Sequence, residues 1–211
     1  MEPRVWAAYL AAGESRRFGS PKLKALLRGI PLWRWSWGTL RELRHRHGLH
    51  LLAVVGEEAN DLPLDADQVL FNRERHEGMA SSLRLAVEAA ARERARALLI
   101  VLADMPLITV ATLERILRAW QPGRIVLARG SFGVSPPAFF DAAFFPDLKG
   151  LKGDRGARAL ARRHENALIL VEVDDQELWD VDTPQDLERA ALILGEGGGA
   201  GSLGRDGGPF R

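Results

Sequence analysis

The chain has 211 residues, 46% hydrophobic and 27% charged, which is enough for one globular domain with a sizeable core. Its 29 basic and 28 acidic residues leave a net charge of +1, so the overall charge gives no attraction to nucleic acid or to an anionic membrane. It has no cysteine, which excludes disulfides, thiolate metal sites and cysteine nucleophiles.

Strands and helices are expected to alternate along the chain. Short apolar runs predict strands, whereas helical spacing of apolar side chains predicts helices. The expected strands cover residues 5–10, 51–55, 68–71, 97–102, 125–128 and 167–173. The expected helices cover residues 31–43, 81–94, 109–120, 153–163 and 183–194, with Pro31 in the first helical turn and Thr109 and Thr183 as N-caps. Composition predicts a loop at 130–137, then a short helix or apolar flap at 137–145.

This alternation predicts βαβ units, and therefore a mostly parallel sheet covered by helices on both faces. Residues 1–195 are expected to form the domain, and the Gly-rich stretch 196–211 a flexible tail, because it has no hydrophobic face to bury. Glu2 stands where a signal peptide needs positive charge, and no stretch approaches the roughly 20 apolar residues of a membrane helix, so we expect a cytoplasmic protein.

Ligands of such sheets bind at the carboxyl ends of the strands, here the loops after Leu10, after Leu102 and near Val181. The first loop reads LAAGESRRFGSPK at 10–22. Its small residues at 11–13 allow a ligand to approach the backbone closely, and successive N–H groups in such a turn can cradle phosphate oxygens. The cations that follow can bind phosphate or, alternatively, face solvent around an ordinary turn. These cations are Arg16, Arg17 and Lys22.

Acidic residues near the other two strand ends could hold a metal ion. Asp104 in LADMP directly follows a hydrophobic strand, a position from which a carboxylate can hold Mg²⁺. Asp180 and Asp182 in WDVDTP are two residues apart, so in an extended stretch both point to one face, and one of them could complete the site. The alternatives are a turn or capping aspartate at 104 and, at 182, a residue that only begins the helix capped by Thr183.

Two further motifs stand at expected helix starts. In EGMASSLR, at 77–84, the hydroxyls and free N–H groups of Ser81 and Ser82 could bind a base edge or a phosphate, with an ordinary serine N-cap as the alternative. In GDRGAR, at 153–158, three charged residues could form a salt-bridged helix start or reach an anionic second substrate. These charged residues are Asp154, Arg155 and Arg158.

Together and in this order, the five motifs resemble the molybdenum cofactor nucleotidyltransferases, a branch of the glycosyltransferase-A-like nucleotidyltransferases. They lie at 10–22, 77–84, 102–106, 153–158 and 180–184, so the resemblance spans nearly the whole chain except the Gly-rich tail. The nearest likeness is to the molybdenum cofactor cytidylyltransferases, because the first loop begins LAAG, whereas the guanylyl branch more often begins with a Gly-Gly loop. The resemblance implies a Rossmann-like three-layer α/β/α sandwich of the nucleotide-diphospho-sugar transferase type.

The resemblance also implies a Mg²⁺-dependent reaction that joins the phosphate of a molybdopterin-type cofactor to the α-phosphate of CTP or GTP and releases pyrophosphate. A molybdenum hydroxylase apoenzyme would then be a possible protein partner. Arg17 and Lys22 would hold the triphosphate, with Lys22 near the α-phosphate, and Ser82 would contact the base region. The backbone that holds base and ribose would be that of Leu10, Ala11, Ala12 and Gly13.

For the metal, the resemblance implies Asp104 as the main Mg²⁺ ligand and Asp182 as the second, with Asp180 in reserve. An ionised acceptor phosphate is already a good nucleophile, so catalysis rests on positioning and charge neutralisation. This agrees with a motif set that contains Arg, Lys and Asp but no nucleophile–base pair.

The chain departs from the family on the acceptor side of the site, in FGVSPP at 132–137, where related proteins often carry a Gly-His-Pro-like segment. Lys24, where the family usually has an apolar residue, is a smaller departure. Two rival interpretations follow. One keeps the fold and changes the acceptor to a sugar phosphate or methylerythritol phosphate. The other is a non-catalytic chaperone that delivers the molybdenum cofactor to a hydroxylase.

Overall fold

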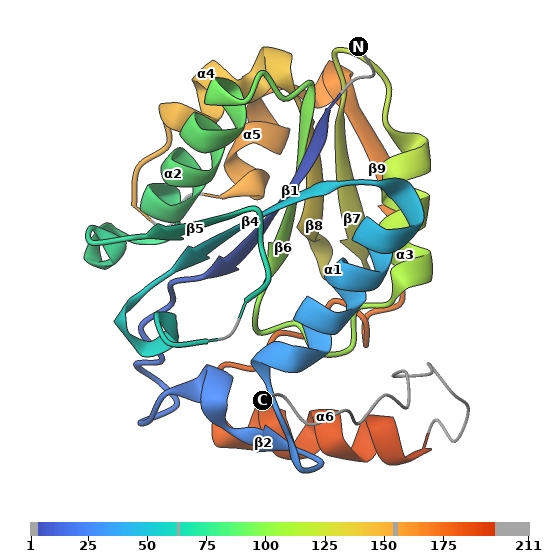
Figure 1. Cartoon of the computed structure of the whole chain (residues 1–211). Helices are drawn as coiled ribbons and strands as arrows, with labels where there is room; N and C mark the ends of the chain where they lie inside the picture. Colours follow the sequence, from blue (N-terminus) through green and yellow to red (C-terminus); the bar gives the residue numbers. More distant parts are fainter. Residues whose placement is uncertain (1–3, 63, 154–155, 197–211) are drawn as a thin grey trace.

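The computed structural model describes residues 4–62, 64–153 and 156–196 (Figure 1). Its main sheet has seven strands in the order β5-β4-β1-β6-β8-β7-β9, all parallel except β8, which runs antiparallel to both neighbours. The strands are β1 (Val5–Ala11), β4 (His50–Val55), β5 (Gln68–Phe71), β6 (Ala97–Leu102), β7 (Ile125–Gly130), β8 (Gly133–Asp141) and β9 (Leu168–Glu172). A separate hairpin joins β2 (Leu26–Leu27) to β3 (Ile30–Pro31).

Helices cover both faces of this sheet. On one face lie α1 (Trp33–His47) and α3 (Val110–Ala119), and on the other lie α2 (Met79–Arg92), α4 (Phe145–Lys149) and α5 (Ala157–Arg163). The last helix, α6 (Pro184–Glu196), packs against β2, beyond the end of the main sheet (Figure 1). The predicted three-layer α/β/α sandwich with a mostly parallel sheet is therefore confirmed. No helix in the described part of the chain is long and apolar enough to cross a membrane.

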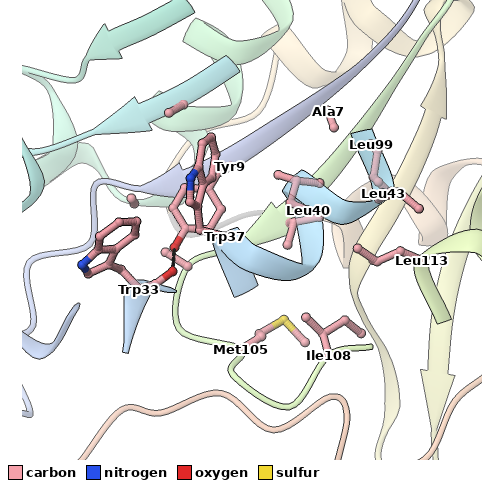
Figure 2. Packing of buried hydrophobic residues seen from close by; sticks show 14 of the residues in the cluster. Ala7, Tyr9, Trp33, Trp37, Leu40, Leu43, Leu99, Met105, Ile108 and Leu113 are labelled. Carbon is pink, nitrogen blue, oxygen red and sulfur yellow. Dashed lines mark hydrogen bonds between the residues drawn. The ribbon is translucent and has the colours of Figure 1, made fainter. Parts of the chain in front are cut away.

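Alternating side chains of the central strand β1 pack into two hydrophobic cores, one on each face of the sheet. Ala7 and Tyr9 point into the cluster under α1 and α3, whereas Trp6 and Ala8 join the cluster under α2. Figure 2 shows the first cluster, in which the Tyr9 ring packs edge-on against the Trp37 ring of α1, with 5.0 Å between the ring centroids. This double burial explains why β1 reads as a continuous apolar run in the sequence, as expected for a strand covered on both faces.

The structure differs from the sequence prediction most clearly at β8. The predicted loop at 130–137 and the predicted helix or flap at 137–145 are both wrong, because Gly133–Asp141 forms a strand between β6 and β7. Its apolar half, Ala138 to Phe140, is buried. Pro136 and Pro137 lie where the register with β7 shifts, so their missing N–H groups do not interrupt the ladder.

Both ends of α1 also differ from the prediction. Pro31, predicted in the first helical turn, pairs with Leu26 in the hairpin, and α1 begins at Trp33. This helix continues to His47, past the predicted end at 43, and stops at Gly48, whose φ of 64° is the left-handed conformation that favours glycine. By contrast, Thr109 caps α3 as predicted, since its side chain accepts a hydrogen bond from the Thr112 N–H.

The packing of β1 against α1 generates a stability prediction. The buried Tyr9 hydroxyl donates a hydrogen bond of 2.8 Å to the Trp33 carbonyl oxygen (Figure 2). Tyr9→Phe is expected to lower the free energy of unfolding by about 1 kcal/mol, the usual contribution of such a bond. Urea unfolding should show a lower midpoint with an unchanged slope. An unchanged midpoint would show that this bond does not help to hold α1 on the sheet.

Candidate functional site

The loops that follow four neighbouring strands meet at one edge of the sheet. Ala12 follows β1, Gly56 follows β4, Asn72 follows β5 and Asp104 follows β6 by two residues. The parallel register of these strands brings their carboxyl ends to the same level. Val181 reaches the same edge, because its N–H donates a 2.9 Å hydrogen bond to the Asp104 carbonyl oxygen. All the loops at which the sequence predicts ligand binding therefore lie together.

Lys22 joins these loops through its ammonium group. Its Nζ donates hydrogen bonds to Asp104 Oδ2 at 2.8 Å, to Asp182 Oδ1 at 3.0 Å and to the Val181 carbonyl oxygen at 2.9 Å. Lys22 is only 7% exposed, so solvent screens these contacts weakly. The contacts of the Asp104 and Asp182 side chains are with cations, which argues against capping or turn roles alone for these carboxylates.

The charges of this group interact strongly. Burial alone would lower the pKa of Lys22, but the carboxylates of Asp104 and Asp182 outweigh it and hold that pKa above its usual value. Desolvation raises the pKa of the Asp180 carboxyl, although solvent reaches much of the residue, and the negative charge of Asp104 raises it further. One lysine thus stands among three aspartates, and the cluster retains an excess of negative charge when all of them are ionised.

Arg17 extends the group toward solvent. Its Nη1 donates a 3.0 Å hydrogen bond to Asp182 Oδ2, and its side chain is 78% exposed. Arg16 instead pairs with Glu14 at 2.5 Å. The backbone at the start of the loop is partly accessible: Ala11 and Ala12 are buried, but Gly13 is exposed, and a Cβ atom placed there would meet nothing within 4 Å. Space for a ligand therefore exists beside this backbone.

Asp104 fits a divalent cation in its chemistry. Its Oδ1 atom is buried and has no hydrogen-bond partner among the described residues, while Oδ2 contacts Lys22. An unpaired buried carboxylate oxygen carries a free-energy cost that a hard cation would remove. Within the described ranges, no three His, Asp or Glu side chains are grouped as a complete metal site. Any ion bound by Asp104 and Asp182 would therefore need further ligands from substrate or water.

Ser82 lies in the first turn of α2 and is held by a residue that the sequence analysis missed. The buried Asn72 donates from Nδ2 to Ser82 Oγ at 2.9 Å and to Ser81 Oγ at 2.8 Å. The N-cap of α2 is Gly78, so the predicted alternative of a serine N-cap is wrong. Asn72 could have been noticed as a polar residue directly after the strand at 68–71. No hydrogen bond of Ser82 reaches Lys22.

The motif at 153–158 lies against the start of α2. The Ala80 N–H donates a 3.0 Å hydrogen bond to the Gly153 carbonyl oxygen, and Gly156 packs so closely on Met79 that a Cβ atom would come within 2.9 Å of its sulfur. The motifs at 77–84 and 153–158 are therefore neighbours. Arg158 donates from Nε to the Val134 carbonyl oxygen at 2.6 Å. The predicted acceptor residues Asp154 and Arg155 lie outside the described residues.

The buried contacts of Lys22 generate a pH-dependent prediction. Lys22→Met leaves the carboxylates of Asp104 and Asp182 facing each other, and we expect a loss of about 1–3 kcal/mol at pH 8, less than a fully buried pair would give because Asp182 is partly exposed. A raised lysine pKa stabilises the fold fully below the unfolded value of about 10.4 and loses this effect as pH rises through the folded value.

The measurement is urea unfolding of both proteins with a chelator, at several pH values from 8 upward. The gap in unfolding free energy between wild type and Lys22→Met should be constant up to about pH 10 and then shrink. A gap that widens at high pH would contradict this account of the ion pairs.

Comparisons with known proteins agree with this geometry. Residues 7–167 match the family described as the MobA-like NTP transferase domain. The chain is 32% identical to the purine catabolism protein PucB of Bacillus subtilis, over 90% of this chain and 98% of that protein. It is 27% identical to a probable molybdenum cofactor guanylyltransferase of Opitutus terrae, over 86% of this chain and 92% of that protein.

Among solved structures, Rv0371c of Mycobacterium tuberculosis H37Rv in complex with manganese is similar, with a TM-score of 0.71 and 27% identity over 90% of this chain and 98% of that chain. The sequence resemblance, the fold and these comparisons lead to one conclusion. The chain belongs to the MobA-like NTP transferase family and is a nucleotidyltransferase.

Proposed function

We propose that the protein transfers CMP from CTP to the phosphate of a molybdopterin-type cofactor and releases pyrophosphate, with GTP as the alternative donor. The observation that carries this proposal is the contact of one buried lysine, Lys22, with Asp104 and Asp182. This contact brings a cation that can bind phosphate and two carboxylates together at the carboxyl edge of the parallel strands, where nucleotides bind in such folds.

In this mechanism, an oxygen of the acceptor phosphate attacks the α-phosphorus in line. The new bond joins that oxygen to the α-phosphorus, and the bond from the α-phosphorus to the bridging oxygen of pyrophosphate breaks. Lys22 and Arg17 neutralise charge on the triphosphate, with Lys22 near the α-phosphate. The backbone of residues 10–13 holds base and ribose, and Ser82 contacts the base region. Positioning and charge neutralisation together supply the rate enhancement.

Asp104 and Asp182 would hold Mg²⁺, and the unpaired Oδ1 atom of Asp104 supports this assignment. When bound, Mg²⁺ supplies charge neutralisation and alignment of the phosphates. The manganese complex of Rv0371c supports a divalent cation in this family. In the present structure Lys22 contacts both carboxylates, so its ammonium group would have to turn toward the triphosphate when a cation binds there.

The acceptor would lie toward the motif at 153–158, with Asp154, Arg155 and Arg158 as its charged residues. The described part of this motif lies against α2, beside the segment that carries Ser82. A molybdenum hydroxylase apoenzyme would then receive the product. The acceptor itself is tested by incubating the protein with molybdopterin, labelled CTP or GTP and Mg²⁺, and measuring pyrophosphate release. Turnover with a sugar phosphate or methylerythritol phosphate in place of molybdopterin would contradict the proposal.

The choice of CTP rests on the LAAG start of the first loop, at residues 10–13, and it yields a binding prediction. CTP with Mg²⁺ should raise the thermal midpoint more than GTP, ATP or UTP, because a ligand that binds only the folded state stabilises it. Thermal unfolding at equal nucleotide concentrations measures this order. The relative from Opitutus terrae is named a guanylyltransferase, so a larger shift with GTP is the outcome that would replace CMP by GMP in the proposal.

The Asp104→Asn variant should distinguish the enzyme interpretation from the chaperone interpretation. Loss of this carboxylate removes several kcal/mol of charge stabilisation, which at about 1.4 kcal/mol per factor of ten means at least a 100-fold loss of turnover. Asp61→Asn is the matched control, since Asp61 pairs with Lys24 at an exposed site and should leave turnover unchanged. Pyrophosphate release measures both variants. Unchanged delivery of cofactor to a hydroxylase by Asp104→Asn would favour the chaperone interpretation.

A further inference from the structure

Lys22 stands at the end of a loop that leaves the sheet at Ala11, and the conformation of this loop decides where its ammonium group points. Ser15 is the turning point. Its φ of 49° is in the left-handed region, which is unfavourable for a residue with a side chain. Its carbonyl oxygen accepts hydrogen bonds from the N–H groups of Phe18 and Gly19, which fold the loop back. A strained residue at such a position needs support from its surroundings.

The Ser15 hydroxyl supplies that support on two sides. It accepts a 3.1 Å hydrogen bond from the backbone N–H of Lys22 and donates a 2.6 Å hydrogen bond to Glu58 Oε2. The bond to Glu58 is short and involves a carboxylate, which makes it stronger than a bond between neutral groups. A chain of hydrogen bonds thus runs from Glu58 through Ser15 to the backbone of Lys22.

Glu58 itself is firmly placed. It belongs to a short 3-10 helix, Glu57–Ala59, in which Ala59 is 1% exposed and anchors the segment in the core. The preceding Gly56 lies directly on the first loop, since a Cβ atom there would come within 3.1 Å of the Ala12 carbonyl oxygen. The segment after β4 therefore forms a fixed wall beside the loop that carries Lys22.

We infer that Glu58 is a positioning residue for the nucleotide site: through Ser15 it holds the loop in the conformation that places Lys22 beside Asp104 and Asp182, from where its ammonium group can turn to the phosphates. No motif of the sequence analysis contains Glu58. Its effect on nucleotide binding rests on the proposed function, whereas its effect on loop order does not. When residue 58 loses the oxygen that accepts from Ser15, a fraction of molecules should leave the binding conformation, and the apparent affinity for nucleotide should fall by that fraction.

Four variants test this inference. Glu58→Ala removes the acceptor, whereas Glu58→Gln keeps an amide oxygen that can still accept from Ser15. Ser15→Gly keeps the left-handed backbone and removes the hydroxyl. Asp61→Ala is the matched control, because Asp61 ties the same segment to the short 3-10 helix that follows the first loop, through an exposed ion pair with Lys24. Circular dichroism and the thermal midpoint verify that each variant is folded.

The order of the first loop is measured without any nucleotide. Mass spectrometry follows the rate at which trypsin cleaves the chain after Arg17. Cleavage at an exposed loop reports how often the backbone opens. We expect Glu58→Ala and Ser15→Gly to be cut about 5–10 times faster than wild type and no faster when combined, since both break one chain of bonds. Glu58→Gln and Asp61→Ala should be cut at the wild-type rate, within about twofold.

Nucleotide binding is measured by titrating CTP and GTP with Mg²⁺. Glu58→Ala should raise Kd and KM for the accepted nucleotide about 5–10-fold, with kcat at saturation within about twofold of wild type. The inference is overturned if folded Glu58→Ala is cut at the wild-type rate, or if Asp61→Ala matches it. If wild type binds neither nucleotide, the proposed function fails, and the cleavage rates alone decide whether Glu58 orders the loop.

Discussion

The site depends on one buried ammonium group. Lys22 contacts carboxylates that follow β6 and precede α6, so a single charge holds together three parts of the chain that are distant in sequence. The negative charge of this cluster is not fully neutralised, because three aspartates surround one lysine. In addition, one buried oxygen of Asp104 has no hydrogen-bond partner among the described residues. A site of this kind favours a further cation, and with it a ligand that carries phosphates.

The rest of the architecture can be understood as support for that charge cluster. The parallel strands β4, β1 and β6 bring Gly56, Ala12 and Asp104 to one level, and the wall after β4 lies against the first loop. Apolar packing on both faces keeps these strands rigid, and rigid elements hold charged side chains more accurately than loops do. The loop itself is held by the side-chain hydrogen bonds of Ser15 together with the packing of Phe18 against the core.

Much of this could be predicted from local sequence signals. Strand β6 has the predicted bounds, and Lys22 contacts both Asp104 and Asp182, which lie in loops that the sequence assigns to the carboxyl edge of the sheet. Strand β8 could not be predicted, since its two prolines read as a loop and only the register shift in β7 tolerates them. Glu58 escaped for another reason: it acts through Ser15, which lies 43 residues away, and it carries no local pattern. Asn72 did have a local signal, its place directly after β5, but its contacts with Ser81 and Ser82 appear only in the structure.

The antiparallel direction of β8 also determines where the turn before it lies. It places the turn between β7 and β8 at the same edge as the loops of Ala12 and Asp104. Asp175 braces this turn through the Ser131 N–H, while Phe132 at its tip is 91% exposed. A hairpin tip can change in length or composition without disturbing the strands beneath it. The scaffold thus combines a charge cluster fixed by the sheet with an adjacent hairpin tip whose length and sequence can change, a division that would let related proteins differ at this tip while they keep the cluster.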